Sequence, residues 1–265
     1  MLKISFYFEK EQERNIDHHI LQWFFYNLLW NKKEKYHDLK YSLFNFGNIF
    51  PFEKWQNYQA GKLYSIYFKT VEKEICFSVY ETLTLKKEFA FWKNNKLIVK
   101  KVIYIKDDPI YPGKIIKWIT PIIISIYKDL AEKYGIKFKA RLWRPMYWIK
   151  EMWFDIFINQ LTKNILSKYI FLIEKWYVDK LNDFDKSLLE IYKDKNKFEE
   201  FIKNIDLFSW YKYKRLASVY YKGIKIPWSI WDFKVNNNLN YVKILHYVSQ
   251  IWLGERCSAG FGFVL

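Results

Sequence analysis

The sequence has few of the residues that mark a metal centre, a disulfide framework or a flexible chain. Its 265 residues include two cysteines, six prolines and eight glycines. Two cysteines are too few for a disulfide framework or a zinc site, so we expect a cytoplasmic protein with no bound metal or cofactor. No apolar run reaches 18 residues, and the run at 20–30 contains polar residues and no small-residue cleavage site. We therefore expect no membrane span and no signal peptide.

Acidic residues are scarce relative to basic ones. The chain has 44 lysines and arginines against 28 aspartates and glutamates, a formal net charge of +16. A surplus of this size favours a polyanionic partner, nucleic acid before an anionic membrane. Lysine enrichment also has compositional causes, so the five arginines among the 44 are the more informative cations. The glycine patterns of P-loop and dinucleotide-binding enzymes are absent, which argues against both classes.

Apolar residues, 51% of the chain, are arranged in patterns that predict a repeated order of elements. The first set has strands at 2–8, 41–46 and 62–69, helices at 17–31 and 71–83, and a hairpin at 88–92 and 97–105. The second set has a strand at 115–127, helices at 146–175 and 182–203, strands at 205–221 and 224–235, a helix capped by Asn240, and a last strand at 262–265. Two copies of β-α-β-β-α-β predict an α+β protein with two tandem ferredoxin-like (RRM-like) domains. Pro109, Pro112 and Gly113 place the boundary, giving domains at 1–112 and 113–265.

The C-terminal tail concentrates glycine in a chain that otherwise has little. Gly254, Gly260 and Gly262 lie within the last thirteen residues, with Arg256 and Ser258 between them. Glycine permits close approach of backbone N–H groups to a ligand, and arginine and serine donate to phosphate. The tail is therefore a candidate phosphate-binding loop, and the alternative is an ordinary loop that leads into the last strand.

Two other groups of cations are candidate RNA contacts. Arg141 and Arg144 flank Trp143, which combines phosphate-binding forks with a ring on which a base can stack. The alternative is an exposed loop around a buried tryptophan. Lys214 and Arg215 lie on a predicted strand, where the alternative is a solvated charged face.

Four stretches of the chain together resemble a known family. They are the glycine-rich tail at 254–262, Trp118 to Ile122, the helix from Phe157 to Tyr169, and Tyr36 to Phe44. In these stretches the sequence resembles the CRISPR repeat-processing endoribonucleases of the RAMP superfamily. It departs from the family pattern at Trp252, where the family often has the first glycine of a Gly-apolar-Gly motif. The resemblance implies the fold inferred above and metal-independent cleavage of precursor CRISPR RNA. In that reaction the 2′-hydroxyl upstream of the scissile phosphate attacks it, leaving 2′,3′-cyclic phosphate and 5′-hydroxyl ends.

The resemblance also implies catalytic roles. His37 would be the general base or acid, since an unperturbed histidine titrates near neutral pH. Tyr26 would assist by hydrogen bonding, and Lys40 would stabilise charge on the phosphorane. His18 and His19 remain alternatives to His37. Trp23 is a rival of Tyr26, Lys54 is a rival of Lys40, and we expect a structural role for His246.

The implied partners are CRISPR repeat RNA, both precursor and mature, and other subunits of a CRISPR effector complex. The many aromatic residues leave room for a homodimer. One alternative is a non-catalytic RAMP RNA-binding protein or a subunit of an interference complex, which would not depend on His37. A third hypothesis is a single-strand nucleic-acid binder with little preference for repeat sequence.

Overall fold

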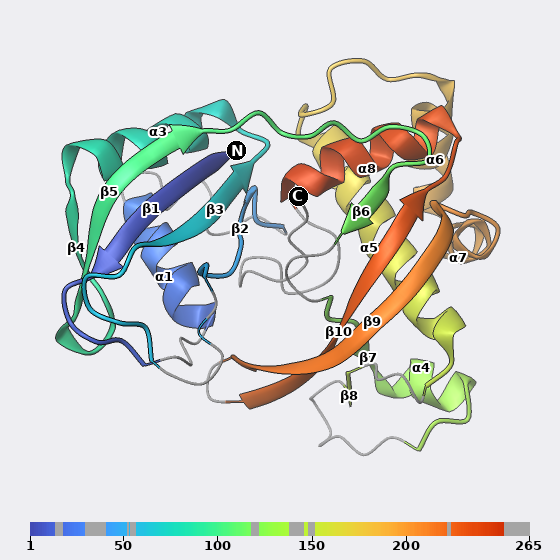
Figure 1. Cartoon of the computed structure of the whole chain (residues 1–265). Helices are drawn as coiled ribbons and strands as arrows, with labels where there is room; N and C mark the ends of the chain where they lie inside the picture. Colours follow the sequence, from blue (N-terminus) through green and yellow to red (C-terminus); the bar gives the residue numbers. More distant parts are fainter. Residues whose placement is uncertain are drawn as a thin grey trace.

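A computed structural model describes residues 1–13, 18–29, 41–51, 53, 57–117, 122–137, 146–147, 152–221 and 224–251. For a few of these, mainly at the far ends of the two longest strands, only the backbone is described. The described chain forms two larger antiparallel sheets, of five and three strands, and one two-stranded sheet, with helices between and beside the larger sheets (Figure 1). The α+β class predicted from the sequence is confirmed.

The first sheet contains five antiparallel strands. In spatial order they are β2 (Phe44–Phe46), β3 (Tyr64–Thr70), β1 (Leu2–Phe8), β5 (Lys96–Tyr104) and β4 (Glu88–Ala90). Helix α1 (His18–Leu28) connects β1 to β2 across β3, and α3 (Lys73–Leu85) connects β3 to β5 across β1. These two split β-α-β units are the ferredoxin-like arrangement, and β4 is an added edge strand. The 3-10 turn η2 (Trp92–Asn94) joins β4 to β5, as the predicted hairpin requires.

Alternation along β1 sets the core of this sheet. Leu2, Ile4, Phe6 and Phe8 are fully buried, while the residues between them are half-exposed. Phe25 of α1 packs between two rings of the sheet, with centroid distances of 4.9 Å to Phe46 and 5.0 Å to Phe68. Burying a ring of this size contributes about 2–3 kcal/mol, so these contacts fix α1 on the sheet.

The second sheet is built around a long two-stranded ribbon, visible as a curved pair in Figure 1. Its order is β6 (Ile115–Lys117), β10 (Ile224–Val235) and β9 (Phe208–Tyr221). Helix α5 (Phe154–Glu174) lies between β6 and β9 in the chain, and α8 (Leu239–Ile251) follows β10. The three strands therefore have the relative order of the first three strands of a ferredoxin-like fold. The predicted last strand at 262–265 lies outside the described residues.

The strand predicted at 115–127 is wrong in extent. The structure has β6 and, separately, β7 (Ser125–Ile126). Strand β7 pairs with β8 (Met146–Tyr147) in a two-stranded sheet of their own. The helix predicted to begin at residue 146 is also wrong at its start. Residues Met146 and Tyr147 form β8, and α5 begins at Phe154. The short helix α4 (Lys128–Lys133) was not predicted. Pairing between segments distant in sequence overrides local pattern here, and an isolated β-bridge also joins Ile122 to Ser229.

The predicted helix at 182–203 is two helices, α6 (Asp183–Lys193) and α7 (Lys195–Lys203). Asp194 separates them, and its carboxylate accepts hydrogen bonds from the first backbone N–H groups of α7. The cap predicted for α8 is also wrong by two residues. Asn238 accepts from the backbone of Asn240 at 2.9 Å, so Asn240 lies in the first turn.

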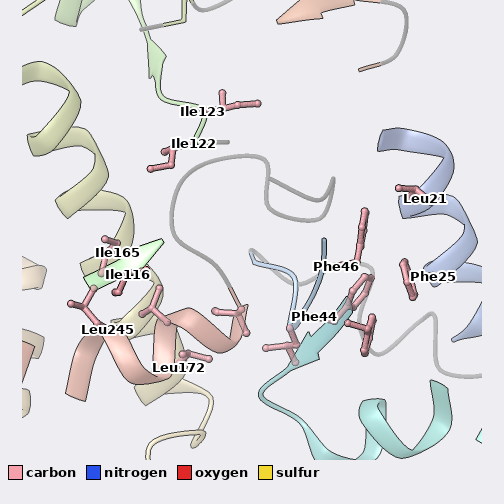
Figure 2. Packing of buried hydrophobic residues seen from close by; sticks show 14 of the residues in the cluster. Leu21, Phe25, Phe44, Phe46, Ile116, Ile122, Ile123, Ile165, Leu172 and Leu245 are labelled. Carbon is pink, nitrogen blue, oxygen red and sulfur yellow. The ribbon is translucent and has the colours of Figure 1, made fainter. Parts of the chain in front are cut away.

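A continuous apolar core joins the two sheets. We call the first sheet with α1 and α3 the first part, and the chain from β6 to α8 the second part. Figure 2 shows buried residues of the second part, including Leu172 and Leu245, in the same cluster as Phe44 and Phe46 of the first part. Helix α8 packs on α5 and also contacts β2 and β3 of the first sheet. Tyr177, beyond the end of α5, donates a hydrogen bond of 2.9 Å to the Glu72 carboxylate before α3. In the described part of the chain, no helix is long and apolar enough to cross a membrane.

Candidate functional site

Tyr26 is the one proposed catalytic residue that lies among the described residues. It is half-buried near the end of α1, and its ring meets the ring of Phe44 edge-on with centroids 5.1 Å apart. Burial raises the pKa of Tyr26, and a hydrogen bond with the Ser42 side chain opposes that change. A tyrosine is protonated at neutral pH even at its ordinary pKa, so the raised pKa leaves the Tyr26 phenol with a proton to donate.

Ser42 fixes the backbone that leads into β2. Its hydroxyl donates to the carbonyl of Phe44 at 3.1 Å and accepts from the N–H of Phe44 at 3.4 Å. This local turn holds the Tyr26 partner in place at the edge of the first sheet.

Helix α5 contacts Tyr41, which precedes β2 in the chain. The Tyr41 ring packs against Phe171 with centroids 5.3 Å apart, and Lys168 Nζ lies 5.9 Å from the Tyr41 ring centroid. Lys168 is 1% exposed. Residue 41 directly follows Lys40 in the chain, so this contact joins both sheets beside the predicted catalytic segment.

Asn164 lies one helical turn before Lys168 on α5. Residues four apart share a helix face, so the two side chains lie on one side of α5. Asn164 Oδ1 is buried, and no described group donates a hydrogen bond to it. Sequence reasoning did not assign Lys168 or Asn164 to the site. The signal was a lysine and an asparagine, spaced by one turn, within the apolar run of this helix.

The remaining histidines lie elsewhere. His19 is exposed near the start of α1, seven residues before Tyr26, which corresponds to about 10 Å along a helix. His18 begins the helix. His246 lies on α8, where burial is the largest cause of a lowered pKa; Lys69 and Lys114 also lower it, and Asp107 opposes them. These three groups lie outside α8, on β3 and between β5 and β6.

Lys214 and Arg215 are exposed on β9, the outer strand of the second sheet. Lys214 lies in a bulge and forms an ion pair of 2.7 Å with Asp232 of β10. Arg215 pairs with Ile230. The structure places these cations on the β9–β10 ribbon, and β9 also contacts α1.

The other predicted site residues lie outside the described residues. They are His37, Lys40, Arg141, Arg144, Gly254, Arg256, Ser258, Gly260 and Gly262. Among the residues that the structure describes, no group of three or more histidine, cysteine or acidic side chains is arranged to hold a metal ion.

Comparisons with known proteins identify the fold. No family model matches the chain, and the comparison with curated proteins found no match. Several solved structures match it along its whole length. One is described as an RAMP protein binding different RNA substrates, with a TM-score of 0.62 and 12% identity over 100% of this chain and 98% of that one. The chain therefore has the same fold as this RAMP protein.

Two further matches are more particular. A CRISPR-associated protein Cas6 superposes with a TM-score of 0.61 and 17% identity, covering 100% of this chain and 98% of that chain. A Cas6-related protein from Pyrococcus furiosus gives a TM-score of 0.62 and 14% identity, covering 100% and 97%. The chain has the fold of Cas6 proteins, as the resemblance in its sequence implied.

Proposed function

We propose that this protein is an endoribonuclease that cleaves precursor CRISPR RNA within its repeats. The observation that carries the proposal is the match to Cas6 structures along the entire chain. The net charge of +16 agrees with an RNA partner. We also propose the division into domains 1–112 and 113–265, since Gly113 turns the chain with a positive φ between β5 and β6.

In the proposed reaction the ribose 2′-hydroxyl upstream of the cut attacks the phosphate, without a metal ion. His37 removes or returns the proton, and Lys40 stabilises charge on the phosphorane. Tyr26, which is protonated at neutral pH as an ordinary tyrosine is, donates a hydrogen bond to the reacting phosphate. The glycine-rich tail with Arg256 and Ser258 holds backbone phosphates, as do Arg141, Arg144, Lys214 and Arg215. Other CRISPR effector subunits and a second copy of the chain are the proposed protein partners.

The test is cleavage of a labelled repeat RNA from the source's own array in excess EDTA. We expect one cut by the wild type and no cut in a substrate with deoxyribose upstream of the scissile phosphate. His37→Ala should lower the single-turnover rate about 10²–10⁴-fold. His19→Ala is the matched control, because His19 is exposed two turns from Tyr26. A rate lost with His19→Ala and retained with His37→Ala would transfer the acid–base role to His19.

The second candidate function is RNA binding without cleavage. The match to the RAMP protein described as binding different RNA substrates supports it as strongly in fold terms as the Cas6 matches support cleavage. Tight binding of repeat RNA with no cut in the same assay would favour this candidate. Binding that does not distinguish the repeat from an unrelated single strand would favour the general single-strand binder.

A further inference from the structure

The second sheet turns one face towards its helices and one face to solvent. Strand register decides which residues lie on each. Ile116, Phe233 and Tyr211 form one cross-strand row, in which Ile116 and Phe233 are fully buried and Tyr211 stacks on Phe154 of α5 at 4.2 Å. Because side chains alternate along a strand, the neighbouring rows point the other way. We call this opposite side the outer face.

Two cross-strand rows make up the outer face near the start of β6. Register places Ile115 beside Lys234 and Lys234 beside Trp210. The next row on the same face is Lys117, Asp232 and Lys212. All of these side chains are exposed except that of Asp232, which is paired with Lys214.

A hollow of about 510 Å³ opens on this face. It is bordered by Ile115, Ser209, Trp210, Lys234 and Asn237. Trp210 is 43% exposed, and in the described part of the chain no cation or second ring stacks on it. The hollow thus combines a free aromatic face, a hydroxyl, an amide and a cation.

Charge complementarity identifies the kind of occupant. Four lysines on this face, Lys117, Lys212, Lys214 and Lys234, oppose the single carboxylate of Asp232. A positively charged surface with an open ring is the arrangement that binds single-stranded nucleic acid, with a base on the ring and phosphates on the cations. A duplex keeps its bases stacked inside and offers no base face to a tryptophan.

We propose that the outer face of the second sheet binds a single-stranded segment of the RNA substrate, with one base stacked on Trp210 in this hollow. Lys234 contacts the adjoining phosphate, and Ser209 and Asn237 contact the polar edge of the base. Lys212 and Lys117 continue the phosphate path along the sheet. The identity of the polymer rests on the proposed function, whereas the location rests on the register, the hollow and the charges.

The test measures the Kd of a fluorescein-labelled repeat RNA by anisotropy, using deoxyribose upstream of the cut so that the probe stays whole. Trp210→Ala should raise the Kd about 5- to 100-fold, the usual cost of losing one base–aromatic stack. Trp210→Phe, which keeps a ring, should remain within about threefold of the wild type. Trp176→Ala is the control, because Trp176 is 89% exposed beyond the end of α5 and does not border the hollow.

Two further readouts separate phosphate contact from general loss of fold. Lys234→Gln should reduce the slope of log affinity against log salt by about 0.7, the value for one phosphate contact on a single strand. All variants should unfold at the wild-type denaturant midpoint. A Kd unchanged by Trp210→Ala overturns the proposal, and a protein ligand for the face would be one cause of that result.

The outcome is distinguishable from that of the cleavage test. Wild-type protein that binds the probe through Trp210 but never cuts repeat RNA would remove the endoribonuclease and leave this binding face. Cleavage that continues with an unchanged Kd in Trp210→Ala would leave the endoribonuclease and remove the face.

Discussion

Each of the two parts of the molecule contains a polar network of the same kind, but the outer faces of their sheets differ. In the first part, the Tyr64 hydroxyl donates to Glu53 at 2.9 Å and Lys62 donates to the same carboxylate at 2.6 Å. In the second, Tyr169 and Lys243 donate to Asp185 at 2.8 and 2.5 Å. A tyrosine, a carboxylate and a lysine thus tie secondary structure together in each part, in unrelated stretches of sequence.

The outer faces differ in what covers their rings. On the first sheet, Lys3 Nζ lies 5.9 Å from the ring centroid of Tyr67, and Lys100 Nζ lies 5.2 Å from that of Tyr7. On the second sheet, Trp210 lies beside lysines that do not stack on it, within the described residues. Cation–π pairs within the chain occupy the ring faces that a base would need, so the first sheet is closed to stacking and the second is open.

The largest expected effect on stability comes from Asp185→Ala. Asp185 is 1% exposed, accepts from Tyr169 and Lys243, and also completes the capping box of α6 with Asn182. Its removal leaves the buried Tyr169 hydroxyl without its acceptor and opens the capping box, whereas Lys243, which is 23% exposed, still donates to the Lys180 carbonyl. The lost acceptor and the lost cap together should cost about 3–5 kcal/mol of unfolding free energy. Urea unfolding measures this value. Asp183→Ala is the control, because Asp183 is fully exposed in the same turn and should change stability by less than about 1 kcal/mol.

Glu53→Ala should have a smaller effect, about 1–3 kcal/mol. The carboxylate is buried, but its partner Lys62 is 37% exposed and can be hydrated after the change. Tyr64 also keeps the hydrogen bond that its oxygen accepts from the Gln59 N–H. The control is Glu88→Ala, whose carboxylate is exposed in a 3.5 Å pair with Lys96. A loss as large as that of Asp185→Ala would contradict the idea that the capping role of Asp185 and the second hydrogen bond of Tyr64 separate the two networks.

The network of the first part also predicts a dependence on alkaline pH. Burial raises the pKa of Tyr64 to about 12, with the neighbouring Glu53 acting in the same direction. A raised pKa in the folded state gives a stabilisation that is present below about pH 10 and lost as the pH rises towards 12. Between pH 10 and 12 the free energy of unfolding of the wild type should therefore fall more steeply than that of Tyr64→Phe, by up to about 1.4 kcal/mol per pH unit.

Urea unfolding at pH 9, 10 and 11 measures the slope. Tyr127→Phe serves as the control, because Tyr127 is an exposed tyrosine outside both networks. The variant Tyr64→Phe will itself be less stable at pH 9 through the lost hydrogen bonds, so only the change with pH is informative. Parallel curves for Tyr64→Phe and the wild type would show that Tyr64 does not titrate differently on unfolding.

Much of the fold could be predicted because it is encoded locally. Alternation predicts β1, and the local pattern also predicts the hairpin of β4 and β5 and the long strands β9 and β10. The division of 115–127 could not be predicted, because β7 exists only through its pairing with β8, some twenty residues away. Short strands of this kind are specified by tertiary partners rather than by their own sequence.

The candidate site shows the same limit. The family resemblance implies a role for Tyr26, but its partners Ser42 and Phe44 depend on sheet order. The sequence alone does not distinguish Trp210 from the other tryptophans, of which the chain has 13 in all. Only the register of β9 with β10 and of β10 with β6 places it on the outer face. The roles of His37, Lys40 and the glycine-rich tail remain predictions from family resemblance.

The smallest expected effect sharpens the comparison of the outer faces. Lys100 and Lys234 are both exposed lysines on strands, but Lys100 lies over Tyr7 on the first sheet and Lys234 borders the hollow on the second. Lys100→Gln should change the Kd for repeat RNA by less than about twofold and leave its salt dependence unchanged, since an unused lysine releases no counterion. Anisotropy titrations at several salt concentrations compare it with Lys234→Gln. Equal losses of RNA affinity in the two variants would mean that binding depends on net charge alone. The open ring of Trp210 would then no longer distinguish the second sheet from the first.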